Sequence, residues 1–110
     1  MFAVCNAPMI GGGYVIAPDA LIDDGGLDVV MVPRMPMLEF VAALQQIASG
    51  SGASDARVRR FRASAFELCF SRVVRVNVDG ELLEADTCTY AVQHRAARFF
   101  CGPSPHAAHA

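Results

Sequence analysis

The feature that most limits how this chain can fold is an alternating apolar pattern in its second half. Apolar residues alternate with more polar ones over residues 66–70, and valines do so again over residues 74–78. This period of two is typical of half-buried strands. Asp79 and Gly80 follow directly, and Asp-Gly is a strong signal for a two-residue turn. The pattern therefore predicts antiparallel strands joined by a tight hairpin.

Further strands are expected on both sides of this hairpin. β-branched and apolar runs predict strands at residues 2–5, 27–32, 87–92 and 97–101, and one long strand or two strands over residues 58–70 with a break near residues 63–65. Residues 6–26 are instead rich in Gly, Pro and Asp and show little periodicity. A loop of that length in a small domain is usually functional or disordered.

One segment has the signals of an amphipathic helix. Pro36 and Gly50 bracket residues 37–49, and these residue types suit the first turn and the end of a helix. Apolar residues recur inside it at helical spacing: Leu38, Val41, Leu44, Ile47 and Ala48. About six expected strands and one helix predict a mostly β fold. Because the strands gather mostly after the helix, we expect many neighbouring strands to be antiparallel. The expected architecture is an antiparallel β-sandwich, or a partly open barrel, with one helix at about residues 37–49.

The composition fits one small folded domain. A length of 110 residues is typical of a single domain, and a hydrophobic share of 54% with 18% charged residues excludes a disordered chain. Residues 49–56 have the composition of a flexible linker. We therefore expect one β-sandwich domain over residues 1–102 and a disordered tail over residues 103–110.

The charge and the cysteine content of the chain indicate which binding partners and which cellular compartment to expect. The net charge is -2, and all nine basic residues are arginines, so nucleic acid is not an expected partner. No run approaches the roughly 20 apolar residues of a membrane span, and the first residues lack the basic start of a signal peptide. Four cysteines without a C-x-x-C pair indicate reduced, mostly buried thiols, which favours the cytoplasm.

Three motifs carry possible chemistry, and each also has a purely structural explanation. Residues 11–13 are three glycines, which either line a phosphate site or supply a loop that needs positive φ. The four aspartates within residues 19–28 either bind Mg²⁺ or Ca²⁺ or form Asx turns. Asp79 and Glu81 either accept a proton from an attacking hydroxyl or belong only to a hairpin. Taken singly, the structural explanation is favoured each time.

The order of these motifs along the chain adds information. The matching residues are Asn6, Gly11-Gly12-Gly13, Ala17-Pro18-Asp19-Ala20, Asp23-Asp24-Gly25, Leu27-Asp28, Gly50 and Val78-Asp79-Gly80-Glu81. In this order, over about residues 2–101, they resemble the second domain of bacterial diacylglycerol kinases and YegS-like lipid kinases, a family related to sphingosine and ceramide kinases.

This resemblance implies an enzyme that phosphorylates a lipid hydroxyl with Mg²⁺ and ATP. In the family a first, α/β domain holds ATP through a Gly-Gly-Asp-Gly-Thr loop, and the second, β-sandwich domain closes over the cleft. By resemblance, Glu81 is the proton acceptor and Asp79 lies beside it. A structural Mg²⁺ is implied on the side chain of Asp24 and the carbonyls of Leu21 and Gly26, with another aspartate nearby. Family members often carry a larger residue where this chain has Gly26.

The chain departs from the family because no Gly-Gly-Asp-Gly-Thr loop occurs in it. We therefore expect that the ATP-binding domain and some leading strands are missing and that the isolated chain is inactive, because phosphoryl transfer depends on positioned phosphate groups. Missing strands leave an unpaired sheet edge, which predicts a homo-oligomer. The resemblance further implies a lipid substrate and peripheral contact with the membrane. Diacylglycerol, phosphatidylglycerol and a sphingoid base all stay open as substrates.

A different class of function also stays open, namely a non-catalytic β-sandwich that serves as a binding or interaction module. In that case Asp79-Gly80 is only a turn, and the aspartate cluster is only a loop. A rise in melting temperature with Mg²⁺ that Asp24→Ala removes separates the two hypotheses. The arginines at 57, 59, 60 and 62 indicate a solvated strand face, or alternatively a contact with anionic lipid or nucleotide phosphate.

Overall fold

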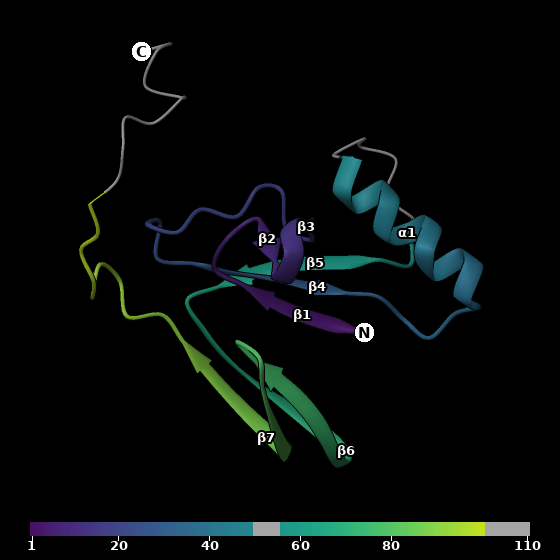
Figure 1. Cartoon of the computed structure of the whole chain (residues 1–110). Helices are drawn as coiled ribbons and strands as arrows, with labels where there is room; N and C mark the ends of the chain where they lie inside the picture. Colours follow the sequence, from purple (N-terminus) through teal and green to yellow (C-terminus); the bar gives the residue numbers. More distant parts are fainter. Residues whose placement is uncertain (50–55, 101–110) are drawn as a thin grey trace.

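The computed structural model describes residues 1–49 and 56–100 and confirms a mostly β fold (Figure 1). Its elements are β1 (Phe2–Cys5), β2 (Met9–Ile10), the 3₁₀ turn η1 (Gly11–Gly13), β3 (Tyr14–Val15), β4 (Leu27–Met31), α1 (Met37–Ser49), β5 (Arg59–Ala63), β6 (Ala65–Val78) and β7 (Glu81–Ala91). Every strand pair among the described residues is antiparallel, and the strands there do not close into a barrel.

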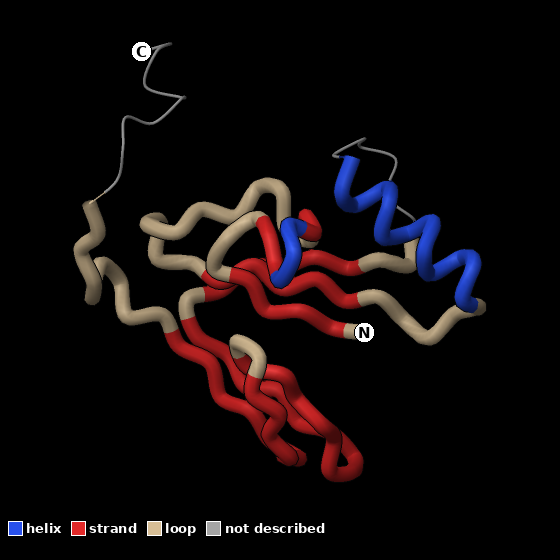
Figure 2. The backbone as a smooth tube through the Cα atoms, viewed as in Figure 1, coloured by secondary structure: helices blue, strands red, loops and turns tan. Residues whose placement is uncertain are grey.

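The central layer is a three-stranded sheet in the order β1-β4-β5. Strand β4 lies in the middle, and its Val29 and Val30 are almost completely buried, which explains why this β-branched run forms a strand. Helix α1 lies on one side of this sheet and the β6–β7 hairpin lies on the other (Figure 2). The expected sandwich-like arrangement is therefore present, with the helix added outside it.

Helix α1 has the predicted bounds, but only part of the predicted apolar stripe is buried. Ala43 and Ile47, four residues apart, are its buried residues, and Phe40 and Leu44 pack partly against the core. Leu38 is instead 86% exposed. The predicted stripe is therefore confirmed at Leu44 and Ile47. It is wrong at Leu38, Val41 and Ala48, which are exposed, because helical spacing alone does not choose between neighbouring apolar stripes.

The long glycine-rich segment contributes to the core rather than forming only a surface loop. Strands β2 and β3 pair as a very short hairpin around η1. Ile16, Ala17 and Ala20 follow and are buried. They join one hydrophobic cluster with residues from the sheet and the helix: Cys5, Val30, Val32 and Ile47. These buried residues hold the segment that connects β1 to β4 against the core.

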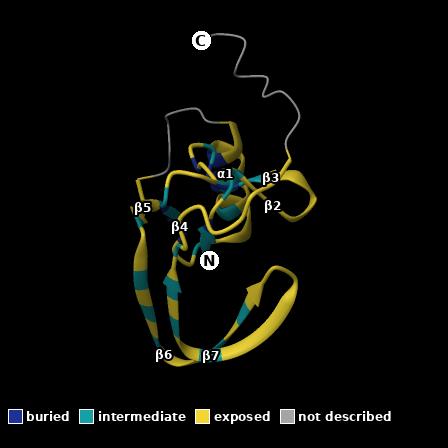
Figure 3. Cartoon of the chain, turned by 90° about the vertical axis from the view of Figure 1, so that its left-hand side faces the viewer, coloured by how far each residue is buried: buried dark blue, intermediate teal, exposed yellow. Residues whose placement is uncertain are grey.

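The β6–β7 hairpin is longer than predicted and strongly bent. The expected strands up to residue 70 and from residue 74 are one strand, β6, which starts after the predicted break near residue 64. Cys69 lies opposite Thr87 and Val74 lies opposite Ala85, so residues 70–73 face a single residue of β7. Such a bulge bends a hairpin. Figure 3 shows that the tip curls back toward β1.

Three other expectations need correction or lie beyond the described residues. Residues 97–100 form no strand, and β7 already begins at Glu81 rather than at residue 87. The three cysteines in the described part of the chain are free, and of these three only Cys5 is buried, while Cys88 is half-buried and Cys69 is exposed. Most of the predicted linker, the fourth cysteine and the predicted tail lie outside the described residues.

Candidate functional site

An open groove of about 910 Å³ separates β1 from the tip of the curled hairpin. One wall consists of residues 1–7 and 9–11, and the other consists of Asn77, Asp79 and Gly80. The bulge in β6 is what brings these walls together, because it turns the tip of the hairpin back toward the sheet. The groove therefore brings together parts of the chain that lie about seventy residues apart.

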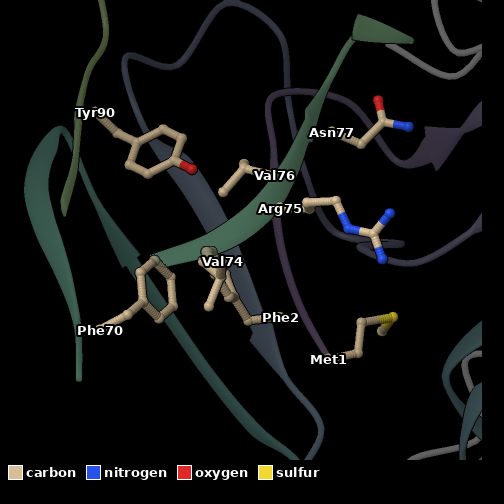
Figure 4. Close-up of a pocket in the computed structure, with 8 residues that line it drawn as sticks. All are labelled: Met1, Phe2, Phe70, Val74, Arg75, Val76, Asn77 and Tyr90. Carbon is tan, nitrogen blue, oxygen red and sulfur yellow. The ribbon is translucent and has the colours of Figure 1, made fainter. Parts of the chain in front are cut away.

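A second, apolar pocket of about 510 Å³ adjoins the groove on the concave side of the hairpin. The rings of Phe2, Phe70 and Tyr90 and the side chains of two valines line most of it, and Arg75 and Asn77 add polar groups, as Figure 4 shows. Met1, Phe2 and Asn77 line both cavities. The groove thus continues into an apolar hollow, which offers hydrocarbon a surface away from water.

The glycine triplet shapes the outer end of the groove. Gly12 and Gly13 have φ angles of 72° and 86°, so they occupy the left-handed region that the sequence predicted. Gly11 itself lines the groove together with Asn6, the first residue of the same motif. Three glycines in succession therefore let the backbone turn back sharply along the groove wall.

The opposite wall is the hairpin turn, and its geometry confirms the turn that Asp-Gly predicted. Asp79 and Gly80 have φ angles of 49° and 96°, which are the two positive values of a type I′ turn. The backbone N–H of Gly80 donates a hydrogen bond of 2.9 Å to Oδ1 of Asn77. This hydrogen bond between the backbone of the turn and the Asn77 side chain stabilises the turn.

The two carboxylates predicted for proton transfer lie at this turn but differ in position. Asp79 lines the groove, whereas Glu81 begins β7, is exposed, and is not among the residues that line the groove. Within the described residues, neither side chain forms a hydrogen bond or an ion pair. Both carboxylates are therefore available to a substrate or to another domain.

The aspartate-rich loop forms a separate cluster. Oδ1 of Asp24 accepts a hydrogen bond of 2.9 Å from the backbone N–H of Gly26, which is an Asx turn. The second oxygen, Oδ2, forms an ion pair with Nη2 of Arg62. No interaction in the described part of the chain links Asp24 to Glu81. The structure therefore brings the glycine motif to the hairpin turn but leaves the aspartate loop apart.

The ligands predicted for Mg²⁺ do not fit the ion in this arrangement. Both carboxylate oxygens of Asp24, the predicted side-chain ligand, already have a partner. One partner is the N–H of Gly26 and the other is the cationic guanidinium of Arg62. Across residues 1–49 and 56–100, no three His, Cys, Asp or Glu side chains lie close enough to hold a metal. The carbonyls of Leu21 and Gly26 alone are weak ligands for Mg²⁺, which prefers carboxylates and water. The magnesium site stays a prediction.

The structure adds three side chains that the sequence did not single out for these roles. Asn77 secures the turn and lines the groove. The sequence predicts Arg62 on a solvated strand face or at an anionic lipid or phosphate, whereas in the structure it pairs with Asp24. His94 places Nε2 at 3.0 Å from the carbonyl oxygen of Asp23. An asparagine two residues before Asp-Gly was the one local signal among these, since the other two contacts depend on tertiary structure.

Cys5 is the thiol that lines the groove, and it is a poor candidate for a nucleophile. Burial, and secondarily the negative charge of Asp28, raise the pKa of its thiol above the ordinary value of 9.0. A raised pKa keeps the thiol protonated near neutral pH, and the thiol is much less nucleophilic than the thiolate. Cys5 therefore supplies no thiolate to the groove near neutral pH. No described helix is long and apolar enough to cross a membrane.

Comparison with known proteins agrees with the fold. Residues 1–101 match the family described as the YegS C-terminal NAD kinase beta sandwich-like domain. The match extends over the sheet, the helix and the hairpin, and so includes both walls of the groove.

Curated relatives give the same result at the level of single sequences. "Probable lipid kinase YegS-like" proteins are 33% identical over 84% of this chain in Pseudomonas fluorescens Pf0-1, 29% over 93% in Shewanella frigidimarina and 38% over 73% in Stenotrophomonas maltophilia. The matched part covers 30%, 33% and 26% of these relatives, so the chain spans about a third of their length or less. The chain belongs to the YegS-like lipid kinase family, as its C-terminal β-sandwich-like domain.

Proposed function

We propose that this chain is the substrate-side domain of an ATP- and Mg²⁺-dependent lipid kinase of the diacylglycerol kinase type. The observation that carries the proposal is the shared groove. Asn6 and Gly11 come from one family-like motif, Asp79 and Gly80 come from another, and all four line one cavity. Residues of two motifs that are far apart in sequence meet where a substrate has room to bind.

The lining of the groove supports a lipid alcohol as the substrate. Its walls include Phe2, Val4, Met9 and Ile10, and the adjoining pocket is lined by aromatic rings and valines. Met9 and Ile10 are 59% and 44% exposed, which is costly in water unless a partner covers them. A lipid that lies at the membrane surface would place acyl carbons along this wall, with peripheral contact between the domain and the bilayer.

The polar end of the groove supports phosphoryl transfer. A carboxylate beside a bound hydroxyl accepts its proton as the hydroxyl oxygen attacks the terminal phosphorus of ATP, and the bond from that phosphorus to the bridging oxygen breaks to release ADP. We assign this role to Glu81, with Asp79 beside it at the groove wall. The remaining part of the enzyme would supply most of the ATP site. For this reason we expect the isolated chain to have no kinase activity.

The decisive experiment joins this chain to the remaining two-thirds of the Pseudomonas fluorescens relative and measures transfer of labelled phosphate to lipid. We expect Glu81→Gln to abolish turnover while ATP affinity and melting temperature stay unchanged. Glu84→Gln is the matched control, because Glu84 lies on the same strand, is also exposed and lies outside the groove lining. Full turnover by Glu81→Gln would refute the assigned role, and phosphorylation by the 110-residue chain alone would refute its expected inactivity.

One observation favours a second candidate, a non-catalytic binding module. Glu81 is exposed and does not line the groove, whereas a proton acceptor must reach the substrate hydroxyl. On this hypothesis the groove binds a lipid or peptide without chemistry, and both Glu81→Gln and Asp79→Asn leave turnover of the joined enzyme unchanged. The same set of variants therefore decides between the two candidates.

A further inference from the structure

An arginine on β5 contacts the aspartate-rich loop at the carboxylate where a cation-binding loop would hold a metal ion. Asp24 is 19% exposed through its side chain, so its charge is partly withdrawn from water. One of its oxygens accepts the N–H of Gly26, and the other pairs with the guanidinium of Arg62. A carboxylate in such a position needs a counter-charge, because unpaired charge is costly to bury.

The sheet, rather than chance contact of a surface side chain, places Arg62 at this loop. Arg62 lies directly opposite Asp28 in the β4–β5 register. Its Nε is 4.0 Å from Oδ2 of Asp28, an oxygen that is buried and has no hydrogen-bond partner among the described residues. One guanidinium therefore lies between two carboxylates, one on the loop and one on the strand that follows it.

Gly26 provides the space for this guanidinium. A Cβ atom added at Gly26 would collide with Nε of Arg62 and would lie only 3.0 Å from its Cζ and Nη2. Any larger residue at this position would push the arginine off the loop. A glycine here and an arginine on β5 therefore belong together, although thirty-six positions separate them in the sequence.

A second side chain, that of His94, also contacts the loop. His94 follows β7, its Nε2 lies 3.0 Å from the carbonyl oxygen of Asp23, and its ring lies 3.4 Å from where a Cβ on Gly25 would stand. Protein atoms therefore already occupy the surroundings of Asp23 and Asp24. Arg62 and His94 each contact this loop, although its residues 21–24 are exposed.

We propose that Arg62 replaces the structural divalent cation in this chain, so that the aspartate loop folds and stays folded without Mg²⁺. The guanidinium neutralises Asp24 and approaches Asp28, and its planar fork suits paired carboxylate oxygens. Removal of the guanidinium frees one carboxylate oxygen of Asp24, and carboxylate oxygens are ligands that Mg²⁺ and Mn²⁺ prefer. This inference does not depend on the identity of the lipid substrate.

The test uses the whole 110-residue chain and two readouts, thermal melting in MgCl₂ against NaCl of equal ionic strength, and the free Mn²⁺ signal in electron paramagnetic resonance. The wild-type chain is expected to melt at the same temperature in both salts and to leave the Mn²⁺ signal unchanged. Arg62→Gln is expected to melt several degrees lower in NaCl, to regain that loss in MgCl₂, and to bind one Mn²⁺.

Matched variants separate this role from a general loss of charge. Arg60→Gln removes an arginine two residues earlier on the same strand, for which the described residues show no ion pair, and it should gain no response to Mg²⁺. Asp24→Asn added to Arg62→Gln should abolish the new Mn²⁺ binding. Gly26→Ala displaces the guanidinium without removing it and should gain a Mg²⁺ response like that of Arg62→Gln.

Two results would overturn the proposal. The first is a wild-type chain that Mg²⁺ stabilises by several degrees or that binds Mn²⁺, since the loop would then be a metal site with the arginine in place. The second is a Gly26→Ala chain that remains insensitive to both ions. If Arg62→Gln does not fold in NaCl, refolding in MgCl₂ supports the proposal, and failure to refold in either salt leaves Gly26→Ala to decide it.

Discussion

The ring of Phe2 on β1 stacks on the ring of Phe70 on β6, with the ring centroids 5.6 Å apart and the planes inclined by 30°. This contact joins the hairpin to the edge of the sheet near the bulge in β6. It also forms part of the apolar pocket. The position of the hairpin tip, and hence the width of the groove, depends on this aromatic pair.

Phe70→Ala is therefore expected to loosen the hairpin and lower the free energy of unfolding by about 2 kcal/mol. The cost is smaller than for a fully buried phenylalanine, because Phe70 is only half-buried. Urea unfolding followed by circular dichroism measures it. Phe100→Ala, at a fully exposed position, should change the stability by less than about 0.5 kcal/mol. Equal losses in both variants would contradict the anchoring role.

The hairpin turn gives a second prediction. Gly80 has a φ of 96°, where an L-residue is strained, although a Cβ there would meet no atom within 4 Å. Gly80→Ala should therefore cost about 1–2 kcal/mol through backbone strain alone. Gly11→Ala is the matched control, because a Cβ there also meets nothing and no positive φ is required. The two variants should differ in urea midpoint, and equal midpoints would contradict the strained turn.

The turn and the helix could be predicted because their causes lie within a few residues. Asp79-Gly80 has the residue types that a type I′ turn requires, and the structure places both residues at positive φ. Met37–Ser49 likewise matches the predicted helix, because Pro36 and the apolar spacing act locally. The buried side of the helix could be predicted only in part, at Leu44 and Ile47, since the rest depends on which neighbours the sheet supplies.

The candidate site was only partly predictable for the same reason. The glycine motif and Asp79 were identified from short patterns, but their meeting in one groove results from the bulge in β6. The pairing of Arg62 with Asp24 requires the β4–β5 register, which links residues far apart in sequence. Residues 97–100 have strand-like composition but form no strand, because composition does not provide a neighbouring edge to pair with.

Cysteine reactivity gives a third prediction. Cys69 is exposed, and its Sγ donates a hydrogen bond of 3.5 Å to Oε1 of Glu67. This bond, together with a small desolvation and the negative charge of Glu67, raises the pKa of the thiol above 9.0. Because the thiolate is the reactive form, a raised pKa slows alkylation at mildly alkaline pH. Glu67→Ala should therefore lower the pKa of Cys69 and speed its reaction with iodoacetamide.

The measurement is the pH profile of alkylation at each cysteine by mass spectrometry. The midpoint for Cys69 should move to lower pH in Glu67→Ala and stay in place in Glu84→Ala. Cys5 serves as an internal reference, since it is buried and its pKa is raised by other causes, so its slow reaction should be the same in all three proteins. A Cys69 profile that does not respond to the loss of Glu67 would contradict the hydrogen bond.

The outer edge of β1 gives the last prediction, which concerns self-association. Met1 and Val32 form a hydrogen-bonded pair. The N-terminal amine of Met1 donates a hydrogen bond of 2.7 Å to the carbonyl of Val32, and the N–H of Val32 donates one of 2.8 Å to the carbonyl of Met1. Hydrogen-bonded pairs alternate along an antiparallel ladder, so the N–H groups of Phe2 and Val4 point away from β4. In the described residues no strand pairs with this edge. It is therefore open to a strand from a second copy.

We expect the chain to form a homodimer through this edge, detectable by light scattering at tens of micromolar. Val4→Pro removes an outward N–H without removing a bond to β4, so it should yield a folded monomer. Val4→Ala trims the same side chain but keeps the N–H, so it should remain dimeric. A monomeric wild-type chain, or a Val4→Pro chain that is folded and still dimeric, would show that β1 does not provide the interface.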